Sequence, residues 1–168
     1  SIGVGVLWTL LLLSSTLSLR KFYQDDIDSG NLFLIHMNGF SYELIVILKT
    51  LSHVLFVQIP FLISIPIGSI LMGISNQQTY SLIISFSIGC FILSSLGSIS
   101  SSMNLLNSRN YLLGSVMVML FSIPVIIFSI GIINLEENFS SLINILVGIL
   151  FIVFEINPWA SASCLKLA

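Results

Sequence analysis

The sequence predicts an all-α integral membrane protein, a polytopic helix bundle. Of its 168 residues, 56% are hydrophobic and only 7% are charged, whereas soluble domains carry about 25% charged residues. The mean hydropathy of +1.10 is typical of the same class. The apolar residues also come in runs long enough for a helix to cross a hydrocarbon core of about 30 Å, which takes about 20 residues.

Five apolar runs are interpreted as membrane spans of a single permease domain that covers residues 1–168. They lie at residues 1–19, 44–74, 80–106, 111–133 and 140–164. Pro60 and Pro66 each remove a backbone donor within the long second run, so we expect that helix to be tilted or bent. The second half of the third run is rich in Gly and Ser, which predicts close packing against other helices. The chain begins without Met inside an apolar run, so we expect an N-terminal segment and a further span before it.

The basic residues predict the orientation of the bundle. If successive spans cross in alternate directions, all five basic residues face one side of the membrane: Arg20, Lys21, Lys49, Arg109 and Lys166. By the positive-inside rule this side is the cytoplasm. We therefore place the C-terminus in the cytoplasm and the turns at residues 75–79 and 134–139 outside. The expected location is the bacterial inner membrane, with the mitochondrial inner membrane as the alternative.

Residues 20–43, between the first two spans, form a segment that is not simply apolar. We expect a short helix there, capped at its N-terminus by Asp28 or Ser29. Asp25, Asp26 and Asp28 would also lie near the positive end of its dipole. The segment is therefore predicted to meet water on the cytoplasmic side and to contact a soluble partner.

The second half of this segment is apolar. Leu32, Phe33 and Ile35 give the expected helix an apolar surface, and Gly39 is expected to end it in the left-handed conformation. A helix of about ten residues cannot span a bilayer, so it either lies in the interface or fills a groove on another protein. A connecting loop that only skims the lipid is the alternative.

Lys49 and His53 are four residues apart, so they share one face of a helix. We expect the Lys49 side chain to reach the cytoplasmic interface and His53 to lie one turn deeper, about 6 Å. His53 is either a haem or proton ligand or, in the interpretation that we favour, a hydrogen-bonding residue inside the bundle.

Glu155 is the other ionisable residue within a predicted span. Counting back from Lys166 places it about 15 Å inside the membrane. A carboxylate at that depth is costly and is by default a functional candidate. The structural alternative is a protonated Glu155, or one that is hydrogen-bonded to Asn157 or to a serine of a neighbouring span.

The sequence contains no catalytic constellation, so we expect a non-enzymatic subunit. It lacks the Gly-rich loop that ends in Lys-Ser or Lys-Thr, so the chain cannot hydrolyse ATP alone. It also lacks a metal-ligand cluster and a C-x-x-C-H motif for covalent haem attachment. Cys90 and Cys164 are expected at different membrane depths, which argues against a disulfide. We expect a lipid environment and no nucleic-acid partner.

Several motifs in order along the chain resemble those of the CcmB family, the haem exporter protein B subunits of the cytochrome c maturation ABC transporter. Asp25-Asp26 with Gly30 and Leu32 is similar to the family's acidic loop, and Lys49 with His53 is similar to its K-x-x-x-H pair. The other matching stretches are Gly5 to Trp8 with Leu12 to Ser15, Ile123-Pro124 with Ile127-Phe128, and Pro158 to Ala160 with Ala162 and Lys166. The chain departs from the family pattern at Ser29 and Phe33, where relatives carry Asp and Glu.

The resemblance implies a six-span permease that couples ATP hydrolysis by a partner subunit to haem export or to release of a haem-loaded periplasmic chaperone. The implied partners are a cytoplasmic ABC ATPase, a second copy of the chain, a haem-handling membrane protein and that chaperone. Haem is then a transported or handled ligand, and residues 20–43 are the coupling segment. The alternatives are an ion-coupled secondary carrier that uses Glu155 and His53, or a scaffold subunit that translocates nothing.

Overall fold

The computed structural model describes residues 2–19, 22–106, 112–134 and 139–167, and all regular elements in them are helices. The elements are α1 (Ile2–Leu19), α2 (Gln24–Asp28), α3 (Asn31–Met37), α4 (Tyr42–His53), the π-helical turn η1 (Val54–Gln58), α5 (Ile59–Leu71), α6 (Asn76–Leu106), α7 (Leu112–Asn134) and α8 (Phe139–Leu167). The predicted all-α class is confirmed. Arg20, Lys21 and Arg109, on which part of the predicted orientation depends, lie outside the described residues.

Four stretches are long and apolar enough to cross a membrane. They are Tyr42–Leu71, Asn76–Leu106, Val116–Ile133 and Phe139–Leu167, found among the described residues. They coincide with the last four predicted spans, so the chain is a polytopic membrane protein. Helix α1 covers 18 residues of the first predicted span, and its crossing of the membrane stays a prediction.

Serine caps set where two of the long helices begin. The Leu44 amide donates to Ser41 Oγ at 3.3 Å, which caps α4, and the Gln78 amide donates to Ser75 Oγ at 3.4 Å. Such side-chain caps satisfy amides that have no partner within the helix. Because of the second cap, α6 begins at Asn76, so the turn expected at residues 75–79 is in fact the first turn of this helix.

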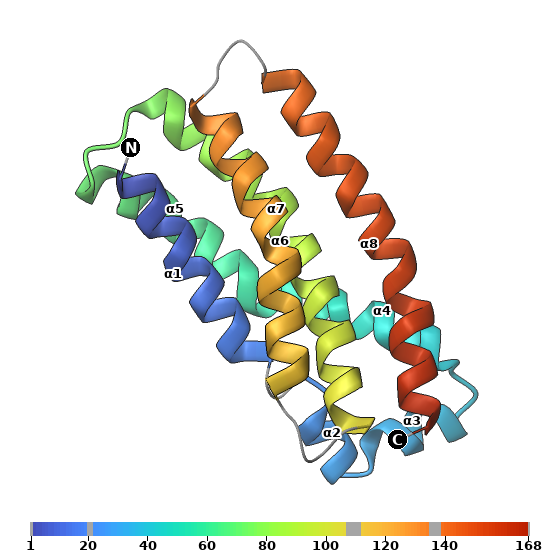
Figure 1. Cartoon of the computed structure of the whole chain (residues 1–168). Helices are drawn as coiled ribbons and strands as arrows, with labels where there is room; N and C mark the ends of the chain where they lie inside the picture. The colour runs from blue at the N-terminus through green and yellow to red at the C-terminus, as the bar shows by residue number, and fades with distance from the viewer. Residues whose placement is uncertain (1, 20–21, 107–111, 135–138, 168) are drawn as a thin grey trace.

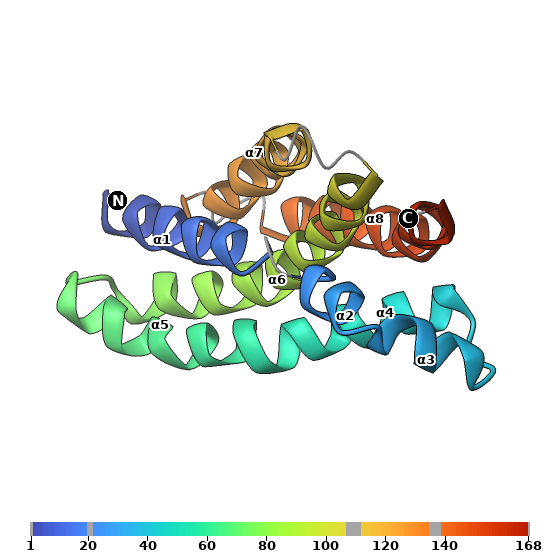
Figure 2. The ribbon, with the colours of Figure 1, turned by 90° about the horizontal axis from the view of Figure 1, so that it is seen from below.

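Helix α6 forms the centre of the bundle. It contacts α8, α7, α1, α5 and α4, and Figure 1 shows α1, α7 and α8 running along its length. Seen from below, α4 and α5 lie on one side of α6 and α7 lies on the other (Figure 2). The Gly- and Ser-rich half of α6 is buried over most of its surface, as the sequence predicts, because small side chains allow helices to approach closely.

Gly89 shows how close that packing is. A Cβ atom added at Gly89 would lie 2.7 Å from the Trp8 ring of α1, so the missing side chain is what admits the indole. Trp8 in turn packs edge-on against Phe86 with ring centroids 5.5 Å apart. The contact fixes α1 against the upper half of α6.

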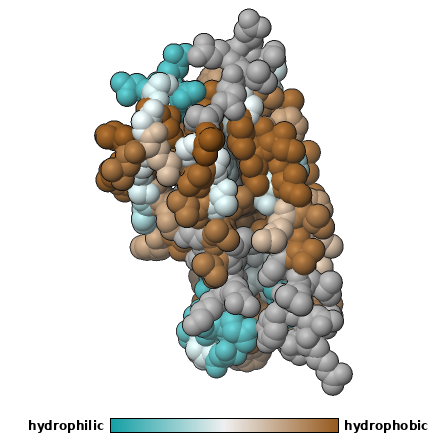
Figure 3. Space-filling model, turned by 60° about the vertical axis from the view of Figure 1, so that its left-hand side comes forward, coloured by the Kyte–Doolittle hydropathy of each residue, from teal (hydrophilic) through white to brown (hydrophobic). Residues whose placement is uncertain are grey.

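The surface is divided into an apolar middle and polar ends. Figure 3 shows hydrophobic residues over the middle of the face that it presents, and hydrophilic residues gathered near the two ends. The lower polar end holds α2 and α3, beside the C-terminal end of α8 (Figures 1 and 2). This end contains most of the candidate functional residues.

Candidate functional site

The segment between α1 and α4 forms two short helices rather than one. Gly30 is the N-cap residue of α3, with a positive φ of 72°, and no side chain caps this helix. The expected cap by Asp28 or Ser29 is therefore wrong, because Ser29 Oγ instead donates back to the Asp25 carbonyl at 2.7 Å and closes α2. The acidic Asp25 and Asp26 lie in the first turn of α2, where they suit the helix dipole.

The C-terminal end of α3 agrees with the sequence. Gly39 has a φ of 94° and donates its amide to the His36 carbonyl at 3.0 Å, so the left-handed ending is confirmed. His36 Nδ1 bonds the Phe40 carbonyl at 2.9 Å, and its ring stacks on Tyr42 with centroids 4.1 Å apart. The turn between α3 and α4 is thus held by its own side chains.

The apolar residues of α3 divide into one that faces the bundle and several that face outward. Leu32 is 7% exposed and packs in a cluster with Phe22, Tyr23, Val46 and Leu165. The outward residues are Phe33, Leu34, Ile35 and Met37, with exposed fractions of 62%, 57%, 42% and 69%. Leu32 therefore anchors α3 to its own chain, while Phe33 and Ile35 are the predicted contact residues that remain available to a partner.

Two ion pairs join the helices at the end of the bundle that holds α2 and α3. Asp26 of α2 pairs with Lys49 of α4, and Lys166 of α8 donates to Glu43 Oε1 of α4 at 2.9 Å. All four side chains are 28–53% exposed, so each pair contributes only about 0–1 kcal/mol. Their main consequence is positional: Lys49 and Lys166, predicted to share one side of the membrane, lie at the same end of the bundle.

A chain of buried polar side chains runs beneath these pairs. Tyr23 Oη and Ser98 Oγ lie 2.7 Å apart, Ser98 and Ser161 hydroxyls lie 3.3 Å apart, and Ser161 Oγ donates to Asn157 Oδ1 at 3.0 Å. Asn157 Nδ2 donates to Thr50 Oγ1 at 3.0 Å. All five residues are at most 1% exposed. This buried polar network joins the turn before α2 to α6, α8 and α4.

Tyr23, one member of the network, has a shifted pKa. Burial, with a smaller contribution from the nearby Asp26 charge, raises the pKa of the Tyr23 phenol well above its usual range. The phenol is therefore neutral, and it can serve as a hydrogen-bond donor to Ser98. Sequence reasoning did not identify this network, because its members come from four separate elements.

His53 lies within the helix bundle, 8% exposed. Its Nδ1 and Ser94 Oγ of α6 are 2.9 Å apart, and its ring centroid is 5.1 Å from that of Phe22. This arrangement favours the hydrogen-bonding interpretation of His53. Lys49, one turn earlier on α4, holds Asp26, so the two residues of the K-x-x-x-H pair contact different elements.

Glu155 lies on an exposed part of α8 and has no hydrogen bond or ion pair within the described residues. Asn157, proposed as its partner, bonds Thr50 instead. That bond places this turn of α8 beside Thr50, next to the half-exposed Asp26–Lys49 pair that is expected at the membrane surface. Because α8 is continuous from Phe139 to Leu167, Glu155 still lies eleven residues before Lys166, and its depth of about 15 Å in the membrane stays a prediction. Glu155 is exposed whereas His53 is buried, and their joint use by an ion-coupled carrier stays a prediction.

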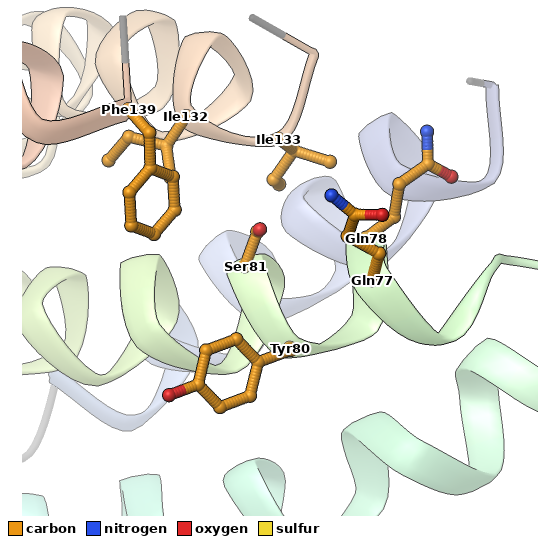
Figure 4. A pocket seen from close by; sticks show the side chains of 7 residues that line it. All are labelled: Gln77, Gln78, Tyr80, Ser81, Ile132, Ile133 and Phe139. Carbon is orange, nitrogen blue, oxygen red and sulfur yellow. The ribbon is translucent and has the colours of Figure 1, made fainter. Parts of the chain in front are cut away.

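A pocket lies at the opposite end of the bundle (Figure 4). Its volume is about 270 Å³, and its lining residues are Gln77, Gln78, Tyr80, Ser81, Ile132, Ile133 and Phe139. The Ser81 hydroxyl points toward α7, whereas the Tyr80 ring points to the other side of α6 (Figure 4). The lining offers amides and hydroxyls without charge, and Glu136, Glu137 and Asn138 of the adjoining turn lie outside the described residues. Across the described ranges, no group of three or more His, Cys, Asp or Glu residues is placed to hold a metal ion.

Comparison with known proteins identifies a matching family and several similar proteins. A family model described as CcmB protein matches residues 1–168. Heme exporter protein B of Paracoccus denitrificans is 31% identical over 101 residues, which are 60% of this chain and 46% of that protein. The proteins of the same name from Haemophilus influenzae and Pseudomonas aeruginosa are 26% and 24% identical over 98 and 102 residues, or 58% and 61% of this chain and 44% and 46% of theirs. The matched part therefore spans less than half the length of each relative.

Proposed function

The chain belongs to the CcmB protein family, and on that premise we propose that it is the membrane subunit of a haem export system in cytochrome c maturation. The relatives that it resembles are named heme exporter protein B. We further propose that it couples ATP hydrolysis in a partner subunit to haem export or to release of a haem-loaded periplasmic chaperone. A bacterial inner membrane, with the C-terminus in the cytoplasm, is the proposed location.

The observation that carries the coupling proposal is the two-sided character of α3. Its outward side presents Phe33 and Met37, which are four residues apart on one helix face and 62% and 69% exposed. The helix has only 7 residues, so it is far too short to cross a bilayer. An exposed apolar face on a short helix suits a groove on a soluble subunit.

The contacts that α2 and α3 make with the bundle could transmit a displacement of α3 to the membrane spans. Leu32 packs on Val46 of α4 and Leu165 of α8, Asp26 pairs with Lys49, and Tyr23 enters the buried polar network. Movement of α3 therefore has to displace or carry with it the ends of α4, α6 and α8. Packed elements transmit displacement in this way because protein interiors are close-packed.

The proposed partners follow from what the chain lacks and from its family. The sequence has no phosphate-binding loop, so ATP hydrolysis belongs to a separate cytoplasmic ABC subunit that docks on α3. A second copy of the chain completes the transporter, and a haem-handling membrane protein and a periplasmic haem chaperone act with it.

The test replaces Phe33 and Met37 together with Asp. Burying one such side chain contributes about 1.5–3 kcal/mol, so losing two should weaken docking by on the order of a hundredfold or more. We expect the ATPase subunit to be lost during purification in mild detergent, and the yield of cytochrome c to fall. The charge-matched control is Asn31→Asp with Ser41→Asp, which adds the same charge nearby and keeps an N-cap side chain on α4.

If the ATPase subunit stays bound to the Phe33→Asp, Met37→Asp variant at wild-type stoichiometry, α3 is a lipid-skimming loop and the coupling assignment is wrong. If the control variant loses the subunit equally, the effect is one of charge rather than of lost apolar contact, and the assignment is again wrong.

A further inference from the structure

We propose that a shallow pocket on the exposed face of α4 and η1 binds the headgroup of a zwitterionic phospholipid. The lipid phosphate would contact Lys49, and the lipid ammonium would lie near Asp26. The pocket has a volume of about 210 Å³ and is lined by Phe22, Lys49, Ser52, His53, Phe56 and Val57. This volume is small compared with the roughly 300–1,000 Å³ of sites for drug-sized ligands, and it suits a headgroup rather than a whole molecule.

The lining residues form one stripe along the helix. Lys49, Ser52, His53 and Phe56 follow one another at intervals of three, one and three residues, which places them on one helix face over about two turns, about 10 Å. The stripe begins with an ammonium, continues with a hydroxyl and ends with an aromatic ring that is 80% exposed. A phospholipid in a leaflet presents the same order of groups, from a charged headgroup to an apolar chain.

The polar end of the stripe can hold a phosphodiester. The Lys49 ammonium has three donors, of which one faces Asp26, and its side chain remains 32% exposed. Ser52 is exposed on the same face and can donate a second hydrogen bond. His53 also lines the pocket, and its ring is held by Ser94 through Nδ1.

Within the part of the chain that the structure describes, the charges around the pocket favour a headgroup that carries both signs. Asp26 lies against Lys49, and Asp25 and Asp28 are exposed on the same short helix. An anionic headgroup would gain from Lys49 but would be repelled by these carboxylates, whereas an ethanolamine ammonium would be attracted to Asp26. The pocket should therefore bind phosphatidylethanolamine in preference to phosphatidylglycerol.

The experiment measures lipid binding to the purified chain in detergent by native mass spectrometry. Phosphatidylethanolamine and phosphatidylglycerol of identical acyl chains are titrated separately. We expect tighter binding of phosphatidylethanolamine, and about a fivefold loss in Lys49→Gln, since one basic residue near a membrane surface contributes about 1 kcal/mol. Lys166→Gln is the matched control, because Lys166 also lies in an ion pair at this end but does not line the pocket.

A second variant keeps the ion pair intact. Ser52→Trp should fill the pocket from an exposed position and reduce binding at least as much as Lys49→Gln. Wild-type binding in both variants, an equal loss in Lys166→Gln, or tighter binding of phosphatidylglycerol would each overturn the proposal. Displacement of the lipid by millimolar inorganic phosphate would show a site for soluble phosphate and would overturn it as well.

Discussion

Replacing Asn157 with Leu should destabilise the protein, because Asn157 lies at the centre of the buried polar network. Its amide nitrogen donates to Thr50 and its carbonyl oxygen accepts from Ser161, both at 3.0 Å. Leu is close to Asn in size, so the change removes two buried hydrogen bonds and opens little space. It also removes the buried polar link between α4 and α8, and leaves the exposed Lys166–Glu43 pair as the other polar link between them.

The magnitude follows from those two bonds. Side-chain hydrogen bonds inside membrane proteins average about 0.6 kcal/mol and reach about 1.7 kcal/mol, so their loss amounts to about 1–3 kcal/mol. The partners limit this figure, because Thr50 still donates to the Val46 carbonyl at 2.8 Å and Ser161 still has Ser98 within 3.3 Å. We therefore expect a decrease of about 1–2 kcal/mol in the free energy of unfolding.

Maleimide labelling of Cys90 can measure this loss of stability. Cys90 is a free thiol and fully buried, so a maleimide should label it only when the bundle opens. With Cys164 replaced by Ser, the rate and temperature of labelling in detergent report unfolding of this one site. The control is Ser163→Ala, because Ser163 is exposed on the same helix and its one hydrogen bond among the described residues is to the Trp159 carbonyl. Labelling of Asn157→Leu that matches wild type and this control would refute the view that the network holds α4 against α8.

Two further substitutions test the packing and the charge on α8. Gly89→Leu should displace α1 from α6 and lower the labelling temperature of Cys90, because even a Cβ atom at Gly89 would lie 2.7 Å from the Trp8 ring; unchanged labelling would show that α1 is loosely held. Glu155→Gln should leave labelling and protein level unchanged, because Glu155 is exposed and has no partner among the described residues. Wild-type cytochrome c yield in Glu155→Gln would exclude the ion-coupled carrier, whereas complete loss of that yield at a normal protein level would favour it.

The long helices could be predicted from composition, because a membrane span is a strong signal that does not depend on tertiary contacts. Short elements were less predictable. The cap expected from Asp28 or Ser29 is replaced by Gly30 with a positive φ, because Ser29 has an alternative acceptor in the carbonyl of Asp25. Side-chain hydroxyls often choose between such local partners, and sequence alone does not decide between them.

The candidate site was predictable in its location but not in its inner contacts. Leu32 and Phe33 are neighbours of similar character, and only the packing of α3 on α4 and α8 shows that the first is buried and the second exposed. Tyr23 and Asn157 belong to one network although 134 residues separate them in sequence. Pairings of that kind depend on helix register, which hydropathy does not report.

The π-helical turn η1 affects which face of the second span is buried in the bundle. Val46, Thr50, Val54 and Gln58 are all buried although each lies four residues after the last. On a regular α-helix of 3.6 residues per turn, three such steps would rotate the buried stripe steadily around the axis. A π turn, bonded from i to i+5, takes an extra residue and absorbs that rotation. Ile65 of α5, which follows this turn, packs in a cluster with Phe86 and Cys90 of α6. A change of length at η1 should therefore disturb this span more than a change of sequence there.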